Sequence, residues 1–177
     1  MLTVADASPA YALKGVVSND IKTAFRDFTS DGDKGKGKIV FFWPKDFTFV
    51  CPTEIVAFGK LVGEFKDRDA ALYGVSTDSE FVHLAWRQNH DDLKDLPFPM
   101  LSDIKRELVE ALGIVDRAEG VAKRATFIVD PEGIMGFAYV ADSALGVIWR
   151  VPKQGGPAEI WSDDPLLQVP PGAPFPG

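Results

Sequence analysis

The chain has 177 residues, 46% of them hydrophobic and 25% charged, which suits one domain with a hydrophobic core and is short for two. The net charge of -7 disfavours nucleic acid as a partner, because phosphate binding needs clustered lysine and arginine. No apolar run approaches the roughly 20 residues of a membrane helix, and residues 1–9 show no secretory signal. A single cysteine excludes an internal disulfide, so the chain has no disulfide framework to suggest secretion, and we predict a cytoplasmic protein. From the charge and the short apolar runs, we predict that it binds neither nucleic acid nor membrane.

The first predicted elements flank a short loop. Residues 1–38 are weakly patterned, and the lysines and glycines of residues 32–38 predict a flexible loop. Residues 39–43 are a continuous apolar run, as expected for a strand buried on both faces of a sheet. Pro52 and Glu54 favour the start of a helix, whose apolar residues recur at helical spacing as far as Phe65.

Strands and helices alternate in the middle of the chain. Residues 71–76 predict a second strand, and Asp78 or Ser79 is expected to cap a helix with an apolar stripe of Phe81, Leu84 and Ala85. The later predicted elements are an extended piece over 97–102, a helix over 104–112, and strands over 126–129 and 134–140 joined by a turn. This order predicts an α/β sandwich with a mixed central sheet flanked by helices.

The composition of the chain changes after residue 141. Residues 152–177 contain seven prolines and four glycines, a density that excludes a long helix and a central strand alike. We therefore predict one domain over residues 1–141 and a divergent Pro/Gly-rich C-terminal segment over residues 142–177 that is poorly ordered.

The lone cysteine, Cys51, stands where the buried strand gives way to the expected helix. Unpaired N–H groups and a partial positive charge at a helix N-terminus favour a thiolate, which is the nucleophilic form of cysteine. Thr48 can direct its hydroxyl toward the same sulfur, and Pro44 stiffens the wall of the loop. Spacing alone still favours an inert, buried cysteine, because reactive cysteines need a specific environment.

A longer resemblance overturns that inert interpretation. Pro44-x-x-x-Thr48-x-x-Cys51 matches the peroxiredoxin motif, and the run from Phe41 to Glu54 resembles the alkyl hydroperoxide reductase C branch of that family. Further matching segments are residues 74–76, 78–81, 85–87, 96–103 and 124–130. The resemblance is close over about residues 38–140. It implies a thioredoxin-like (peroxiredoxin) fold and a thiol-dependent peroxidase acting on hydrogen peroxide and small organic hydroperoxides.

The resemblance also implies roles for individual residues. Cys51 resembles the peroxidatic cysteine, which attacks the peroxide and becomes a sulfenic acid. Thr48 resembles the residue whose hydroxyl holds thiolate and peroxide, and Pro44 the one that shields the sulfur from water. Arg124 resembles the arginine that lowers the thiol pKa and stabilises charge on the departing oxygen. Glu54 resembles an acceptor that orients this arginine, although an ordinary first-turn glutamate explains it almost as well.

Two histidines, His83 and His90, lie seven residues apart on a predicted helix. We interpret them as surface residues, not as a metal pair or a general base, because no cysteine or carboxylate stands at ligand spacing. The sequence has no GxGxxG pattern and no phosphate loop, so we predict neither a cofactor nor a bound metal.

The resemblance fails at the C-terminus. The branch usually has a further helix and a tail whose resolving cysteine attacks the sulfenic acid of the neighbouring protomer. This chain has no second cysteine, and residues 145–156 with the Pro-rich end replace the expected helix. An external thiol, thioredoxin-like or a dedicated reductase, is therefore expected to complete turnover. A late frameshift and a natural one-cysteine variant both explain this pattern.

Two rival functions follow from the same residues. A thiol–disulfide oxidoreductase on the same fold needs a Cys-x-x-Cys motif. Position 54, where the second cysteine would stand, is glutamate, so we discount this function. A ring-forming holdase chaperone, or a truncated or frameshifted peroxidase without turnover, stays open because of the unusual C-terminus. The family resemblance implies a homodimer or a higher homo-oligomer if the tail permits.

Overall fold

The computed structural model describes residues 6–48, 51–142, 147–151 and 159–162; the side chains of Cys51 and of residues 137–142, 147–151 and 159–162 lie outside this description. The strands are β1 (Ala12–Val16), β2 (Phe25–Thr29), β3 (Gly37–Phe42), β4 (Ala70–Ser76), β5 (Met100–Ser102), β6 (Val115–Asp116), β7 (Val121–Ala122), β8 (Ala125–Val129), β9 (Met135–Asp142), β10 (Val147–Val151) and β11 (Glu159–Ser162). The helices are α1 (Cys51–Lys60), α2 (Val62–Lys66), α3 (Glu80–Asn89), the 3-10 turn η1 (Asp91–Leu93) and α4 (Glu107–Ala111).

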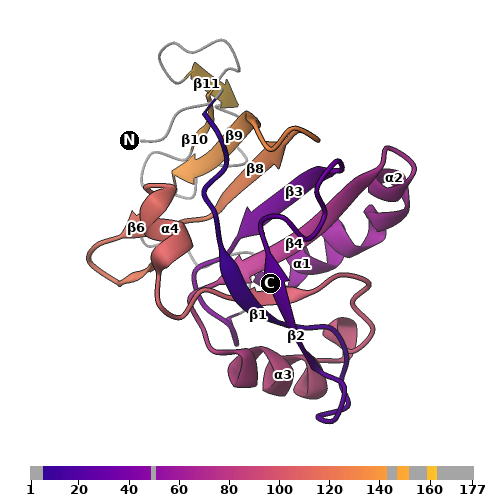
Figure 1. The fold of residues 1–177 in the computed structure, drawn as a ribbon. Coiled ribbons are helices and arrows are strands. Elements are labelled where there is room, and N and C mark those ends of the chain that lie inside the picture. The colour runs from indigo at the N-terminus through magenta and orange to yellow at the C-terminus, as the bar shows by residue number, and fades with distance from the viewer. Residues whose placement is uncertain (1–5, 49–50, 143–146, 152–158, 163–177) are drawn as a thin grey trace.

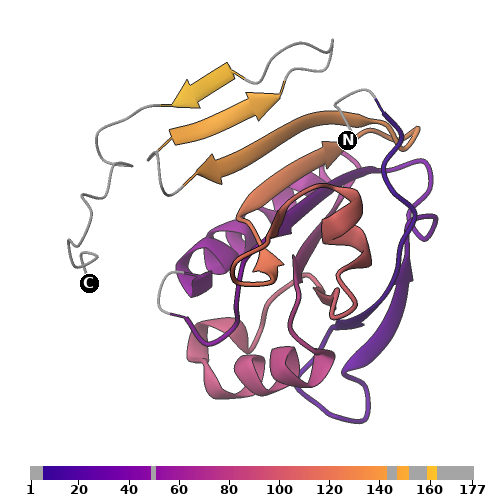
Figure 2. The same cartoon turned by 90° about the vertical axis from the view of Figure 1, so that its left-hand side faces the viewer.

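Nine of the described strands form one mixed sheet, in the order β11-β10-β9-β8-β3-β4-β5-β1-β2 (Figure 1). Strands β3, β4 and β5 run parallel to one another, and the other neighbours pair antiparallel. The expected α/β sandwich with a mixed central sheet flanked by helices is confirmed. Strand β3 lies at the centre of the sheet, and α3 and β11 lie at opposite ends of the molecule (Figure 2).

The apolar run at residues 39–43 is buried because β3 is covered on both faces. Successive side chains of a strand point to opposite faces. Ile39, Phe41 and Trp43 belong to the core cluster under α1, α2 and α3, whereas Val40 and Phe42 belong to the cluster under α4. The packing explains a glycine in the neighbouring strand: a Cβ at Gly74 would lie 2.7 Å from Trp43 Cζ3. The predicted two-sided burial of this strand is therefore confirmed.

Several local predictions were wrong. Residues 1–38 contain the antiparallel pair β1 and β2, and Lys38 is buried within β3, where its ammonium donates to the carbonyl of Ser30. The helix expected as far as Phe65 divides at Leu61 into α1 and α2. Helix α3 is capped by Ser79, whose hydroxyl accepts from the Val82 N–H, but Phe81 is 62% exposed and does not belong to the buried face.

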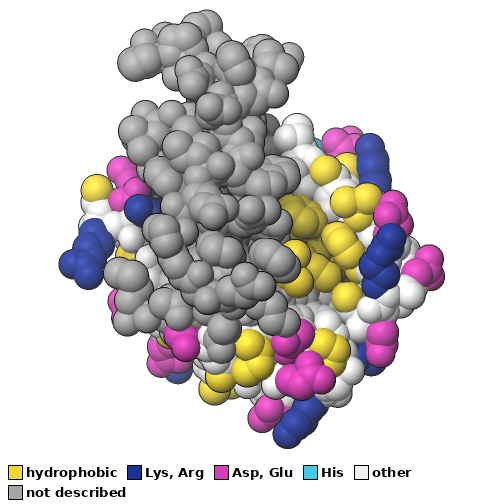
Figure 3. All heavy atoms as spheres, turned by 90° about the horizontal axis from the view of Figure 1, so that it is seen from above, with side chains coloured by type: hydrophobic (Ala, Val, Ile, Leu, Met, Phe, Trp, Pro, Cys, Tyr) yellow, Lys and Arg dark blue, Asp and Glu magenta, His cyan; other side chains and the backbone are white. Residues whose placement is uncertain are grey.

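The described part of the C-terminal segment is β-structure. β9 ends at Asp142, and β10 and β11 extend the sheet beyond it, with β11 at its edge. The prediction of poor order covers residues 142–177, of which residues 143–146, 152–158 and 163–177 lie outside the described residues, and it stays a prediction. Across the described ranges, none of the helices has the length and apolar character to cross a membrane. On the face shown in Figure 3, acidic and basic side chains lie around the edge of the described part of the molecule, beside a patch of hydrophobic side chains.

Candidate active site

The candidate site lies at the carboxyl ends of the parallel strands. The chain leaves β3 into a loop over residues 43–48 and re-enters regular structure at α1, while Asp78 follows β4. The loop is joined to the segment after β4 by the Asp46 N–H, which donates to Asp78 Oδ2 at 2.9 Å. In open α/β sheets this edge of the parallel strands is where ligands bind.

Helix α1 begins at Cys51, as the sequence predicted. Pro52 and Glu54 occupy its first turn, and the helix runs for 10 residues to Lys60. The first N–H groups of a helix have no partner within it, and its dipole places partial positive charge at this end. The backbone thus puts the only cysteine of the chain at a position that favours an anion; the Cys51 side chain lies outside the described atoms.

Arg124 and Glu54 are brought together at this same end of α1. Arg124 immediately precedes β8, and β8 pairs with β3 so that Ala125 lies opposite Phe42. Its guanidinium Nη1 donates to Glu54 Oε2, and the two side chains are 28% and 26% exposed. Burial raises the pKa of Glu54, and the charge and hydrogen bond of Arg124 oppose that rise. The pairing agrees with the glutamate as an acceptor for the arginine.

Thr48 and Pro44 lie on the loop before α1, both half-buried. The Thr48 hydroxyl donates to the carbonyl of Lys45 at 3.2 Å. A hydroxyl carries one hydrogen, so donation to a thiolate requires Thr48 to give up the bond to Lys45. Between Pro44 and Thr48, Phe47 has a backbone φ of +56°, in the left-handed region that residues other than glycine rarely adopt.

Sequence reasoning missed a buried polar cluster beneath this loop. His83, interpreted as a surface residue, is fully buried on α3, and that interpretation was wrong. Its Nδ1 lies 2.6 Å from Asp46 Oδ2, and Asp46 Oδ1 accepts from the indole N–H of Trp43 at 2.7 Å. His90 is half-buried at the end of the same helix. No periodicity signals such partners, because they come from separate segments of the chain.

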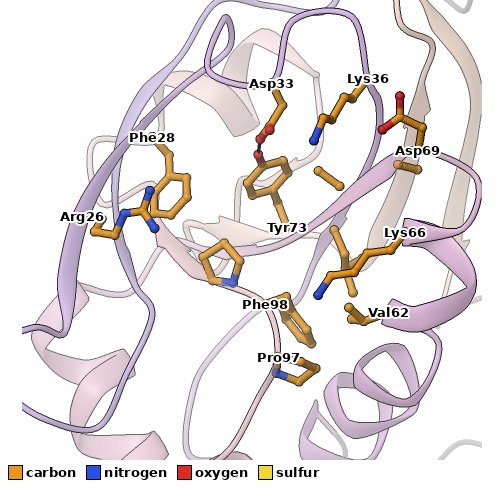
Figure 4. A pocket seen from close by; sticks show the side chains of 14 residues that line it. Arg26, Phe28, Asp33, Lys36, Val62, Lys66, Asp69, Tyr73, Pro97 and Phe98 are labelled. Carbon is orange, nitrogen blue, oxygen red and sulfur yellow. Dashed lines mark hydrogen bonds between the residues drawn. The ribbon is translucent and has the colours of Figure 1, made fainter.

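A cavity of about 450 Å³ lies elsewhere on the molecule (Figure 4). It is lined by the first residues of β4 and by Phe98, with Arg26, Lys36 and Lys66 around it, and Tyr73 donates to Asp33 at its wall. The cavity lies at the amino end of β4, whereas the loop over residues 43–48 lies near its carboxyl end. Among the described residues, no group of three or more His, Cys, Asp or Glu could hold a metal ion.

Both the sequence and the fold of this chain are similar to those of known proteins. The alkyl hydroperoxide reductase C proteins of Mycobacterium tuberculosis H37Rv and Mycolicibacterium smegmatis are each 53% identical over 154 residues, spanning 82% of this chain and 78% of theirs. The structure of Mycobacterium bovis AhpC superposes with a TM-score of 0.74 at 53% identity, over 80% of this chain and 83% of that one. Enterococcus faecalis AhpC superposes with a TM-score of 0.75 at 31% identity, covering 80% and 83%.

The fold is accordingly the thioredoxin-like sandwich of the peroxiredoxins, which are oxidoreductases. The model of the AhpC/TSA family matches residues 4–138, which include all four predicted site residues. The chain belongs to the AhpC/TSA family, in its alkyl hydroperoxide reductase C branch.

Proposed function

We propose that this peroxiredoxin reduces hydrogen peroxide and small organic hydroperoxides through the thiolate of Cys51. The sulfur attacks the terminal peroxide oxygen, the O–O bond breaks, and the products are a cysteine sulfenic acid and an alkoxide or hydroxide that takes a proton from water. The sulfur loses two electrons and the peroxide gains them. Thr48 aligns thiolate and peroxide, and Arg124 stabilises charge on the departing oxygen. Pro44 limits access of water to the sulfur.

One observation carries this proposal: a cation is held at the N-terminus of the helix that begins with the only cysteine. Glu54 lies three residues after Cys51, nearly one helical turn, and binds Arg124. The guanidinium therefore lies at the end of α1 where the helix dipole is also positive. Two sources of positive potential then act on one thiol, and both favour the nucleophilic thiolate.

An external thiol completes the cycle in this proposal, because the chain contains no second cysteine. The first thiol condenses with the sulfenic acid, releasing water and leaving a mixed disulfide on Cys51. A second thiol then attacks that disulfide, regenerating the Cys51 thiol and leaving with the disulfide of the reductant. A thioredoxin-like protein or a dedicated reductase meets this requirement, and a cytoplasmic location stays a prediction.

Peroxide consumption with dithiothreitol as the only reductant tests the proposal. The wild-type chain should consume many equivalents of hydrogen peroxide per Cys51, and Cys51→Ser should consume none above background. A wild-type protein that consumes one equivalent and stops is the peroxidase without turnover. A protein that consumes none, but suppresses aggregation of a heat-denatured client, is the holdase.

Self-association is part of the proposal, and exposed apolar side chains support it. Phe47, Phe81 and Ile104 are 56%, 62% and 56% exposed. They follow the carboxyl ends of β3, β4 and β5 respectively, so all three lie at one end of the sheet. Large apolar side chains gathered on one surface are typical of contact sites between protomers. Sedimentation of the wild type beside Phe81→Ser should show a homodimer or larger oligomer that the substitution weakens; a monomeric wild type would reject the idea.

A further inference from the structure

A buried acid–imidazole pair links α3 to the loop in front of Cys51. The Asp46 and His83 side chains are 1% and 0% exposed. His83 Nδ1 lies 2.6 Å from Asp46 Oδ2, and its Nε2 lies 3.1 Å from the carbonyl oxygen of Leu101. Both ring nitrogens are therefore engaged.

These contacts fix how many protons the pair holds. A carbonyl oxygen can only accept, so Nε2 of His83 carries a hydrogen. The remaining contact to Asp46 needs one further hydrogen, because neither a bare carboxylate oxygen nor an unprotonated ring nitrogen can donate. Whether that hydrogen is on Nδ1 or on Oδ2, the unit is neutral overall, as burial requires.

We propose that Asp46 and His83 are positioning residues for peroxide reduction: their shared hydrogen fixes the loop that carries Pro44 and Thr48, and thereby aligns Thr48 with Cys51. The inference rests on the proposed peroxidase function. Neither residue contacts the peroxide or the sulfur in this proposal; both act through the conformation of the loop.

The loop has a conformation that needs such restraint. Phe47 holds a positive φ, and backbone strain of this kind persists only where the surroundings enforce it. Asp46, its neighbour, is bound three times: at Oδ2 by His83, at Oδ1 by the Trp43 indole at 2.7 Å, and at its own N–H by Asp78 at 2.9 Å. Thr48 follows Phe47 directly. Release of the Asp46 side chain therefore lets the strained residue relax and displaces Thr48.

The chain offers both an isosteric rescue and a matched control. In Asp46→Asn the amide oxygen can accept from Trp43 and the amide N–H can donate to a neutral His83 ring, so both bonds survive. Asp46→Ala loses both. Arg87 lies one turn after His83 on α3, is buried, and donates to the carbonyls of Val16, Phe98 and Leu96, none of which belongs to the loop. Arg87→Met therefore perturbs a buried polar contact of the same helix without touching the loop.

The experiment compares two reactions of the same thiolate. The second-order rate with hydrogen peroxide depends on alignment by Thr48, whereas the rate with iodoacetamide requires only the thiolate. We expect Asp46→Ala to lower the peroxide rate by about 10–100-fold, the range that small misplacements produce, and to change the alkylation rate far less. Asp46→Asn should recover most of the loss, and Arg87→Met should leave the ratio of the two rates unchanged.

Trp43→Phe removes a single donor to Asp46 Oδ1 and gives a milder variant if Asp46→Ala does not fold; it should lower the same ratio to a smaller extent. A wild-type peroxide rate that persists in Asp46→Ala or Trp43→Phe overturns the inference and leaves the peroxidase function standing. If the wild type does not react with peroxide, the proposed function fails instead. Amide hydrogen exchange in residues 45–48 then tests the restraint of the loop independently of peroxide reduction. Equal protection of these amides in the wild type, Asp46→Asn and Asp46→Ala (or Trp43→Phe, if Asp46→Ala does not fold) overturns the inference.

Discussion

Replacement of Arg124 by methionine tests the electrostatics of the site. The change keeps most of the apolar stem and removes the charge, which leaves the Glu54 carboxylate buried without its cation. Removal of one partner costs about 3–5 kcal/mol for a fully buried pair and about 0–1 kcal/mol for an exposed pair. Because the side chains are 28% and 26% exposed, we expect Arg124→Met to lower the unfolding free energy near neutral pH by about 1–3 kcal/mol.

This loss should depend on pH in a defined direction. Burial raises the pKa of Glu54, and both influences that lower it come from Arg124. In Arg124→Met the folded-state pKa therefore rises further above the unfolded value of about 4.3. The folded state then binds the proton more tightly, so the Glu54 contribution favours folding below the unfolded pKa and is lost as pH rises through the folded pKa. The destabilisation should be small near pH 4 and largest near pH 7.

Urea unfolding of the wild type and Arg124→Met across this pH range measures the effect. A Cys51→Ser background removes any contribution from ionisation of the thiol. Glu54→Gln completes a double-mutant cycle, because glutamine carries no charge that the loss of Arg124 would leave unpaired. If Arg124→Met destabilises the protein equally at all pH values, or equally with and without the Glu54 carboxylate, the electrostatic account is refuted.

Three further predictions concern the chemistry of the thiol. Thiolate absorbance of Cys51 should titrate with a midpoint below about pH 7, and a midpoint near the ordinary value of about 8.5 would contradict the assignment. Thr48→Val should slow peroxide reduction in stopped-flow assays while losing only one exposed hydrogen bond to Lys45; an unchanged rate would make Thr48 purely structural. One equivalent of peroxide followed by a sulfenate-trapping reagent should give a monomeric mono-adduct by intact mass, because the chain has no second thiol. A covalent dimer on a non-reducing gel would rule out the one-cysteine mechanism.

The central strands could be predicted because runs of consecutive apolar residues indicate that both faces of a strand are buried. Residues 39–42 of β3 are a continuous apolar run, and the two-sided burial of the strand followed from that run alone. The pair β1 and β2 was missed because it lies at a sheet edge, where β2 is half-exposed and carries Arg26 and Asp27 beside its phenylalanines. An edge strand faces solvent along much of its length, so its pattern resembles that of a loop.

The error in α3 has a different physical origin. Hydropathy placed Phe81 inside and His83 outside, whereas Phe81 is 62% exposed and His83 and Arg87 are buried. Burial of the two polar residues depends on acceptors that lie far along the chain, including Asp46 and the carbonyl of Val16. No local pattern contains that information. The pairing of Arg124 with Glu54 was reached only through family resemblance, since it spans distant segments.

The place of β3 between β4 and β8 has a consequence for the chain while it is being made. Strand β8 leaves the ribosome long after β3, and at about 5–20 residues per second the roughly 80 residues between them take on the order of 4–16 s. Throughout that interval the strand before Cys51 lacks its neighbour β8, and Glu54 lacks Arg124, which arrives directly ahead of β8. In the proposed mechanism, the nascent cysteine therefore emerges without the arginine that favours its thiolate. In the proposed mechanism, the same docking event that closes the centre of the sheet brings Arg124 to this end of α1, so a nascent chain arrested before β8 should have a less reactive thiol than the full chain.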